Sequence, residues 1–201
     1  MGETAASLLS FWTQDVGEAG WYRSSDAIDE GIRTRFRDIW DQGVQAQADP
    51  FDGDPLAAII LFDQFPRNMF RGQAKAFASD ELARSLVHKA LSAGADLETP
   101  EPLRQFYYLP LEHSEDLADQ DEAVRLIESR VSSVETLLHA RAHRRVIREF
   151  GRFPFRNVAL GRDTTAQEAA FLEAGAYPAL VRKMREEVGI PDPDAASGGG
   201  S

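Results

Sequence analysis

The residues of this chain best suited to chemistry are arginines, carboxylates and histidines in three short polar segments. Segments 64–72 and 152–162 each place Phe-Pro shortly before Arg-Asn, with a second arginine beside a glycine. Because proline ends helices and restricts the backbone, we expect each Arg-Asn pair to lie on a rigid turn. Guanidinium groups bind carboxylate or phosphate through two hydrogen bonds. The turns therefore predict an anion clamp made of Arg67, Arg71, Arg156 and Arg162. In the alternative, these arginines brace loops by pairing with carboxylates of the chain itself: Asp63, Glu115, Asp116 or Asp163.

Asp63 is a carboxylate in strongly apolar surroundings, because it directly follows the run Ile59-Ile60-Leu61-Phe62. A buried carboxylate is costly unless it is paired and hydrogen-bonded. Asp63 therefore either holds an arginine in place or has a shifted pKa and takes part in acid–base chemistry.

The third polar segment is His113-Ser114-Glu115-Asp116. A histidine beside two carboxylates is suited to proton transfer or to metal binding. In a purely structural interpretation, Ser114 caps the next helix while Glu115 and Asp116 complement its dipole. That interpretation leaves His113 unexplained.

His139 and His143 are four residues apart, so both can lie on one face of a helix. The spacing suits a metal, but the glutamate arrangement of zinc proteases is missing, and we predict no metal site. A divalent ion held by His113, Glu115 and Asp116 is the alternative. We expect His143 to be an interior side chain hydrogen-bonded to a carboxylate. The sequence has no Gly-rich phosphate loop and no dinucleotide fingerprint, and we predict no cofactor.

Apolar residues recur at spacings of three and four, and no segment alternates like a strand for long, which predicts an all-α fold. The expected helices cover about 8–17, 25–44, 54–65, 79–94, 101–108, 121–150 with a break near 132–133, 164–173 and 177–188. We expect Pro66 and Pro110 to end helices, and Thr164 with Gln167 to form a capping box. The result is an array or bundle of about seven to eight helices. We expect a single domain over 1–188 and a disordered tail over 189–201 that ends in an artificial Gly/Ser linker.

The composition bears on partners and location. The 201 residues include 22 basic and 33 acidic side chains, a net charge of −11 that disfavours binding to nucleic acids. The longest apolar run, 56–62, is too short to cross a bilayer, so we expect no membrane association. Cysteine is absent and no signal peptide is visible, which favours the cytoplasm. The oligomeric state stays open.

Long polar strings, taken in order over about residues 8–175, resemble the bacterial family of unknown function DUF924. The strings are Trp21-Tyr22 with Asp29, and segments 61–72, 76–80, 108–120 and 143–162. The resemblance implies a tetratricopeptide-like helical fold and carries no established activity. His113 and His143 fall on the family pattern, whereas His139 does not. Phe155 stands where the family typically has a histidine, so any role of that histidine is absent or moved here.

Three functions are compatible with these features, and the sequence leaves open whether the protein is an enzyme. We favour an enzyme or binding protein for a small anionic metabolite that bears carboxylate or phosphate, because the His-Ser-Glu-Asp string exceeds what helix capping requires. Its catalytic residues would be Asp63, His113, Glu115 and His143. Its ligand-binding residues would be Gln64, Arg67, Asn68, Arg71, Asp116, Arg152, Arg156 and Asn157. The alternatives are a tetratricopeptide-like interaction module that clamps a partner peptide, and a buried polar network with a structural role.

Overall fold

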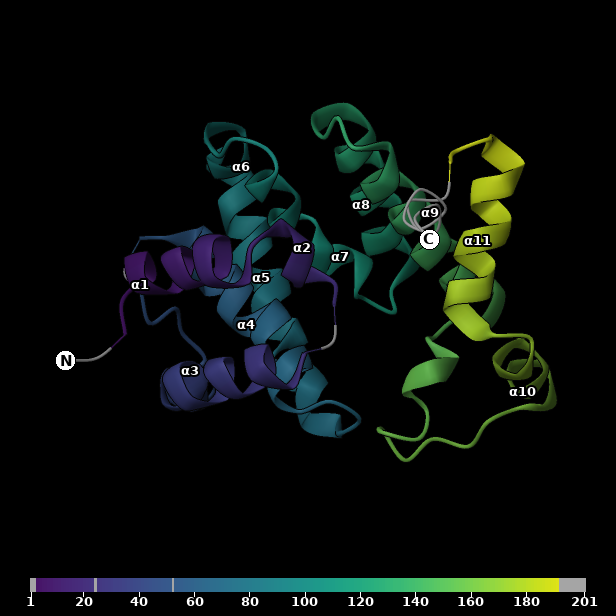
Figure 1. The fold of residues 1–201 in the computed structure, drawn as a ribbon, viewed down its shortest axis with the longest axis horizontal. Coiled ribbons are helices and arrows are strands. Elements are labelled where there is room, and N and C mark those ends of the chain that lie inside the picture. Colours follow the sequence, from purple (N-terminus) through teal and green to yellow (C-terminus); the bar gives the residue numbers. More distant parts are fainter. Residues whose placement is uncertain (1–2, 24, 52, 192–201) are drawn as a thin grey trace, which may run out of the picture. The chain divides into compact units, whose positions relative to one another are not determined.

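The computed structural model describes residues 3–23, 25–51 and 53–191. Over these ranges the secondary structure is helical without any strand, which confirms the all-α prediction (Figure 1). The chain divides into two compact units, Met1–Leu111 and Glu112–Ser201. The single domain predicted over 1–188 stays a prediction, because two compact units can belong to one domain. Of the predicted tail, residues 192–201 lie outside the described ranges. Among the described helices, none is both long and apolar enough to cross a membrane.

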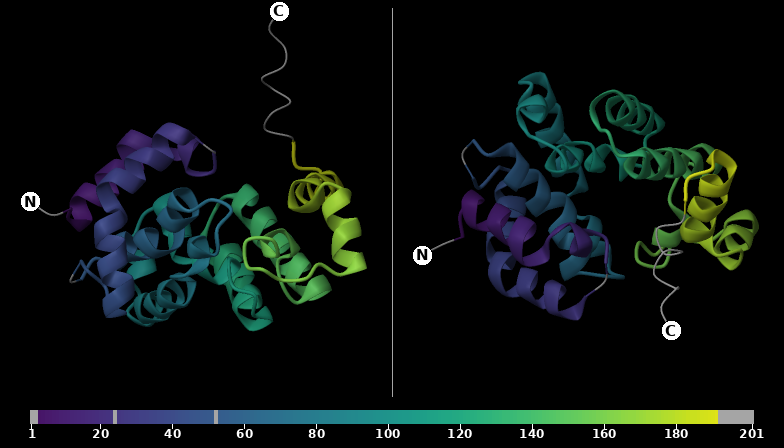
Figure 2. Two further views of the ribbon diagram at one scale, coloured as in Figure 1. Left: turned by 90° about the horizontal axis from the view of Figure 1, so that it is seen from below. Right: turned by 45° about the horizontal axis from the view of Figure 1, so that its top comes forward.

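The helices of the first unit, unit 1, are α1 (Ala5–Ser10), α2 (Glu18–Trp21), α3 (Asp26–Ala46), α4 (Pro55–Met69), α5 (Asp80–Ser92) and α6 (Ala95–Glu98). The short helix α7 (Leu109–Glu112) contains the division between the units. The helices of unit 2 are α8 (Leu117–Arg130), α9 (Val134–Phe150), α10 (Ala166–Glu173) and α11 (Ala176–Val188), with a 3-10 turn, η4 (Pro154–Arg156). Within each unit, the long helices pack against their neighbours (Figure 1 and Figure 2).

Capping side chains explain where several helices begin. The Ser25 hydroxyl accepts a hydrogen bond from the backbone of α3, and Asp54 does the same for α4, whose first residue is Pro55. Ser133 caps α9, so the break predicted near 132–133 is confirmed. The predicted capping box is displaced by one residue. It joins Thr165 to Glu168, not Thr164 to Gln167.

The expectation that Pro66 ends a helix is wrong, whereas the short helix predicted before Pro110 does end before it, as the 3-10 helix η3 (Leu103–Tyr107). Pro110 is the second residue of α7, where a missing backbone N–H costs nothing. Pro66 lies inside α4 and deprives the Phe62 carbonyl of its usual donor four residues on. The Ser79 hydroxyl replaces that donor, because it lies 2.6 Å from the Phe62 oxygen. Ser79 also accepts a hydrogen bond from Trp40 Nε1 at 3.0 Å, which connects the Ser79 hydroxyl to α3.

The core of unit 1 is aromatic and closely packed. The rings of Phe36 and Phe65 lie 4.9 Å apart by their centroids, and Trp12 lies 5.6 Å from Phe65. Helix α3 approaches α4 closely at Gly43, where a Cβ atom would lie 2.5 Å from the buried ring of Phe62. A glycine at this position therefore permits the approach of the two helices.

In unit 2, α9 packs against α8 on one side and α11 on another. One buried cluster contains Leu138, Ala142 and Val181, and a second contains Val146, Ile147 and Phe153. Tyr177, from the first turn of α11, packs against both clusters. Its position places a phenol hydroxyl beside the middle of α9.

Candidate functional site

In unit 1, the arginine that follows Pro66 is bound by two carboxylates. Nη1 of Arg67 lies 3.3 Å from Asp63 Oδ1 and 3.0 Å from Asp80 Oδ1, and Nη2 lies 3.2 Å from Asp80 Oδ2. Burial opposes the charged guanidinium, but Asp63 and Asp80 outweigh it and raise the pKa of Arg67. The Asp63 side chain is 1% exposed and also accepts a hydrogen bond from the Gln64 amide. Arg67 thus forms ion pairs with carboxylates of the chain itself, in agreement with the alternative in which the arginines brace loops.

A second group joins the end of α4 to the start of α3. Arg71 donates from Nε and from Nη2 to the two oxygens of Asp29, with a distance of 2.9 Å for Nη2. Asn68 Nδ2 donates to Asp29 Oδ1 at 2.8 Å. Of the five site residues predicted in unit 1, three therefore contact other helices, namely Arg67, Asn68 and Arg71, while Asp63 contacts Arg67 and Gln64 within α4.

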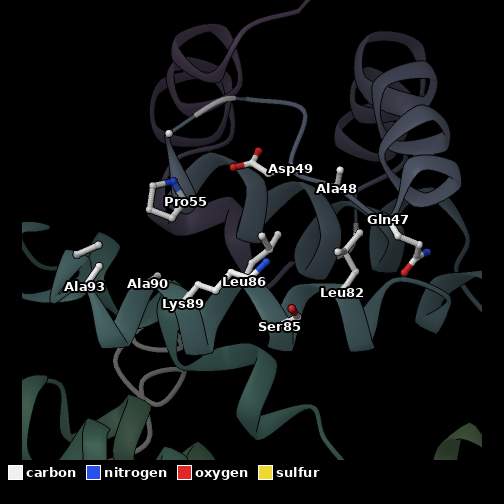
Figure 3. Close-up of a pocket in the computed structure, with 12 residues that line it drawn as sticks. Gln47, Ala48, Asp49, Pro55, Leu82, Ser85, Leu86, Lys89, Ala90 and Ala93 are labelled. Atoms are coloured by element: carbon white, nitrogen blue, oxygen red, sulfur yellow. The ribbon is translucent and has the colours of Figure 1, made fainter.

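A cavity of about 440 Å³ in unit 1 is separate from these groups (Figure 3). It lies beside α5 and the loop between α3 and α4, and its charged lining residues are Asp49 and Lys89. None of the predicted site residues lines it.

In unit 2, Glu115 connects the segment between α7 and α8 to the segment between α9 and α10. Its carboxylate accepts hydrogen bonds from the backbone N–H of Phe153 at 2.8 Å and from Arg162 Nη1 at 2.7 Å and Nη2 at 3.0 Å. Burial alone would raise the pKa of Glu115, but the bonds from Arg162 and Phe153 lower it below its ordinary value. Glu115 is therefore held as an anion, which suits a bracing role better than that of a proton donor.

Arg152 makes a similar pair with Glu168 of α10. Its Nε and Nη2 lie 2.6 and 2.9 Å from the two carboxylate oxygens, and Nη2 also donates to the Asp163 carbonyl. Hydrogen bonds from Arg152 and from the backbone of Thr165 hold the pKa of Glu168 well below its usual range.

Arg156 and Asn157 occupy the turn at η4. Arg156 Nη1 donates to the His113 carbonyl at 3.0 Å, and its guanidinium lies 4.4 Å from the centroid of the Phe153 ring. Asn157 is buried and donates to Thr164 Oγ1 at 3.3 Å. The two Phe-Pro segments differ in structure. Pro66 lies inside α4, whereas Pro154 follows the end of α9, where the C-cap residue Gly151 has the left-handed conformation.

Asp116 has the capping role that was predicted for its neighbour Ser114. Its Oδ1 accepts from the Ala118 N–H at 2.7 Å and caps α8, while Ser114 Oγ accepts from the Asp116 N–H at 3.2 Å. Helix capping thus accounts for Asp116, and the Ser114 hydroxyl bonds to the backbone of that cap residue.

The histidines of the family pattern meet beside a buried glutamate. His143 Nδ1 lies 3.2 Å from Glu112 Oε2, within ion-pair distance, and 3.1 Å from the His139 carbonyl, so the predicted hydrogen bond of His143 to a carboxylate stays a prediction. The side chains are 16% exposed for His143 and 1% exposed for Glu112. The ring of His113 lies 5.9 Å from that of His143, and the Phe153 ring lies 5.6 Å from His143. His143 is therefore a partly accessible imidazole within ion-pair distance of a buried carboxylate.

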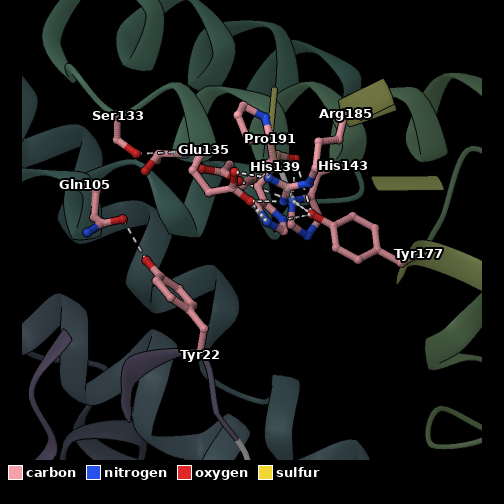
Figure 4. Close-up of polar contacts among 11 residues, drawn as sticks. Tyr22, Gln105, Ser133, Glu135, His139, His143, Tyr177, Arg185 and Pro191 are labelled. Atoms are coloured by element: carbon pink, nitrogen blue, oxygen red, sulfur yellow. Dashed lines mark hydrogen bonds and ion pairs between the residues drawn. The ribbon is translucent and has the colours of Figure 1, made fainter. Parts of the chain in front are cut away.

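A chain of polar contacts leads from His143 towards the surface (Figure 4). Tyr177 Oη lies 3.2 Å from His143 Nδ1 and 2.8 Å from His139 Nδ1. His139 Nε2 lies 3.2 Å from Glu135 Oε1, and Arg185 holds Glu135 with both Nη atoms. Burial, with Glu112 and Glu135 nearby, raises the pKa of Tyr177 well above its ordinary value.

Sequence reasoning missed most of these polar contacts. Glu112 directly precedes His113 and could have been noticed on that ground. Tyr177 carries no local signal, because it meets His143 only through the packing of α11 on α9. His139, which stands off the family pattern, is nevertheless part of the same hydrogen-bonded series.

The residues suggested for a divalent ion are engaged in other contacts. His113, Glu115 and Asp116 take part in the interactions described above. Across residues 3–23, 25–51 and 53–191, no three His, Asp or Glu side chains converge so that they could hold a metal ion.

Comparison with known proteins places these motifs in a family. A solved structure of a protein of unknown function from Agrobacterium tumefaciens is 38% identical, with a TM-score of 0.76, and the match covers 85% of this chain and 97% of that one. No curated protein matches the chain. The model of the family described as "Bacterial protein of unknown function (DUF924)" matches residues 8–176. The chain belongs to the DUF924 family.

Proposed function

We propose that unit 2 carries an acid–base site, centred on His143 and Glu112 with His113 beside them, that binds or converts a small anionic molecule. The observation that carries the proposal is the contact of His143 Nδ1 with the buried carboxylate of Glu112 at 3.2 Å. A carboxylate in this place orients the imidazole and stabilises its protonated form. This arrangement is common to general bases in enzymes.

The position of Arg156 supports an anionic ligand. Arg156 donates from Nη1 to the His113 carbonyl, and its charge contributes to the lowered pKa of Glu115. Its guanidinium and the His143 ring both contact Phe153, at 4.4 and 5.6 Å from the centroid of that ring. Arg156 therefore brings positive charge to the same ring that supports the proposed base. Carboxylate and phosphate groups are the anions that a guanidinium binds best.

A thermal-shift screen with small organic acids, sugar phosphates and inorganic phosphate tests the proposal. An anion present at about 100 times its Kd stabilises the folded protein by about 2.7 kcal/mol, or roughly 5–10 °C in Tm. We expect such a shift with at least one anion, its loss in His143→Gln, and its retention in the control His88→Gln, which changes an exposed histidine of α5. The proposal fails if no anion raises the Tm, or if His143→Gln keeps the whole shift.

A second role, a structural polar network, is favoured for unit 1. Each of Arg67 and Arg71 contacts a carboxylate with two nitrogens, and the partners lie on other helices. Such pairs fix the register of helices more than they add stability. Under this proposal Asp63→Asn lowers the stability of unit 1 and leaves the anion-induced Tm shift unchanged.

A further inference from the structure

His139 and His143 lie one turn apart on α9, and both contact the hydroxyl of one tyrosine. Tyr177 Oη is 2.8 Å from His139 Nδ1 and 3.2 Å from His143 Nδ1. The ring of Tyr177 also packs on His143, with centroids 4.6 Å apart. A role for Tyr177 in orienting these rings rests on the proposed function, in which His143 is the base.

The hydroxyl carries one proton, because burial and the charges of Glu112 and Glu135 keep the phenol neutral. The hydroxyl has one proton, so it can donate to only one of the two rings, and a third acceptor near it, the His139 carbonyl, lies farther away at 3.4 Å. The positions of the ring protons therefore depend on each other.

The carboxylates at the two ends select one arrangement. His139 Nε2 lies 3.2 Å from Glu135 Oε1, so a proton on Nε2 is favoured and Nδ1 accepts from Tyr177. His143 Nδ1 lies 3.2 Å from Glu112 Oε2 and 3.1 Å from the His139 carbonyl. A lone pair on that nitrogen would face two acceptors, so the proton of His143 lies on Nδ1.

We infer that Tyr177 is a positioning residue that holds neutral His139 and His143 in opposite tautomers, Nε2–H and Nδ1–H. Nε2 of His143 is then the nitrogen that takes a proton from a ligand. The rings of His113 and Phe153 also lie beside the His143 ring, at 5.9 and 5.6 Å between centroids. Arg185 keeps Glu135 in place at the far end of the series of contacts.

The tautomers can be read directly from two-bond ¹H–¹⁵N correlation spectra of the full chain labelled with ¹⁵N-histidine, at a pH where the rings are neutral. Signals are assigned with His139→Gln and His143→Gln. We expect the Nε2–H pattern for His139 and the Nδ1–H pattern for His143. The same tautomer at both positions overturns the inference, and this measurement requires no variant of Tyr177.

Tyr177→Phe keeps the ring and removes the hydroxyl. We expect it to shift both histidines towards the tautomer mixture of the exposed His88, while the control Tyr22→Phe, which removes a hydroxyl bonded to Gln105 in unit 1, leaves both unchanged. Unchanged tautomers in Tyr177→Phe would show that the carboxylates suffice and would overturn the role of Tyr177. Opposite tautomers without any anion-induced Tm shift would uphold this inference and refute the proposed function, so the two failures can be told apart.

Discussion

Ser79→Ala tests the explanation of how a proline is accommodated inside α4. The substitution removes the donor to the Phe62 carbonyl, 2.6 Å away, and the acceptor of Trp40 Nε1, 3.0 Å away. Both groups are buried, and each buried polar group left without a partner costs about 1–3 kcal/mol. We therefore expect unit 1 to lose roughly 3 kcal/mol of unfolding free energy, in the lower half of the summed range of about 2–6 kcal/mol.

Urea unfolding followed by tryptophan fluorescence measures this loss, because all three tryptophans, Trp12, Trp21 and Trp40, lie in unit 1. With an m-value of about 2 kcal/mol/M, the midpoint falls by about 1.5 M. Ser92→Ala is the matched control. It removes an exposed hydroxyl at the end of α5 that donates to the His88 carbonyl, and we expect a change within about 0.5 kcal/mol.

The role of Pro66 is tested in the background Pro66→Ala. This substitution restores a backbone N–H four residues after Phe62, so the Phe62 carbonyl no longer depends on Ser79. We expect Ser79→Ala to cost about 1 kcal/mol less in this background than in the native protein. Equal costs in the two backgrounds would refute the reasoning.

Three further substitutions test packing, charge and capping. Gly43→Ala should cost about 1–3 kcal/mol by tryptophan fluorescence, because the new Cβ meets the Phe62 ring at 2.5 Å; an unchanged midpoint would contradict the close approach. Glu115→Gln should destabilise unit 2 at neutral pH. The pKa of Glu115 is lowered in the folded protein, so its contribution to the free energy of unfolding is present above the ordinary carboxyl pKa and is lost as the pH falls through the lowered value. The difference in free energy of unfolding between Glu115→Gln and the native protein, measured by urea unfolding with circular dichroism, should therefore vanish in acid. A difference that grows in acid would reverse the assigned sign. Thr165→Ala should cost about 1 kcal/mol by the same method, because Thr165 caps α10, and an unchanged midpoint would contradict the assignment of the cap.

Local signals predicted the helices well where a side chain caps its own helix. Ser25, Asp54 and Ser133 each bond to the backbone three residues ahead, which sequence spacing can reveal. The prediction for Pro66 is wrong because its compensation comes from Ser79, a residue of another element. A hydrogen-bond donor that comes from another element cannot be predicted from the sequence of the helix whose carbonyl it binds.

The candidate site was predictable only in part. The contact of His143 with a carboxylate followed from its place on an amphipathic helix, but the identity of the partner, Glu112, depends on how the chain folds back between the two residues. The arginine motifs look alike in sequence, yet Arg67 lies within a helix and Arg156 on a turn after one. The pairing partners Asp80 and Glu168 each lie in the first turn of a different helix, and nothing in the motif itself points to them.

The central claim, an anion site at His143, is tested most directly by the ring signals of the four histidines during titration with inorganic phosphate or succinate. We predict saturable shifts at His113 and His143 with at least one of the two anions, while His88 stays constant. No shift at His143 with either anion, or equal shifts at all four rings, would contradict the claim.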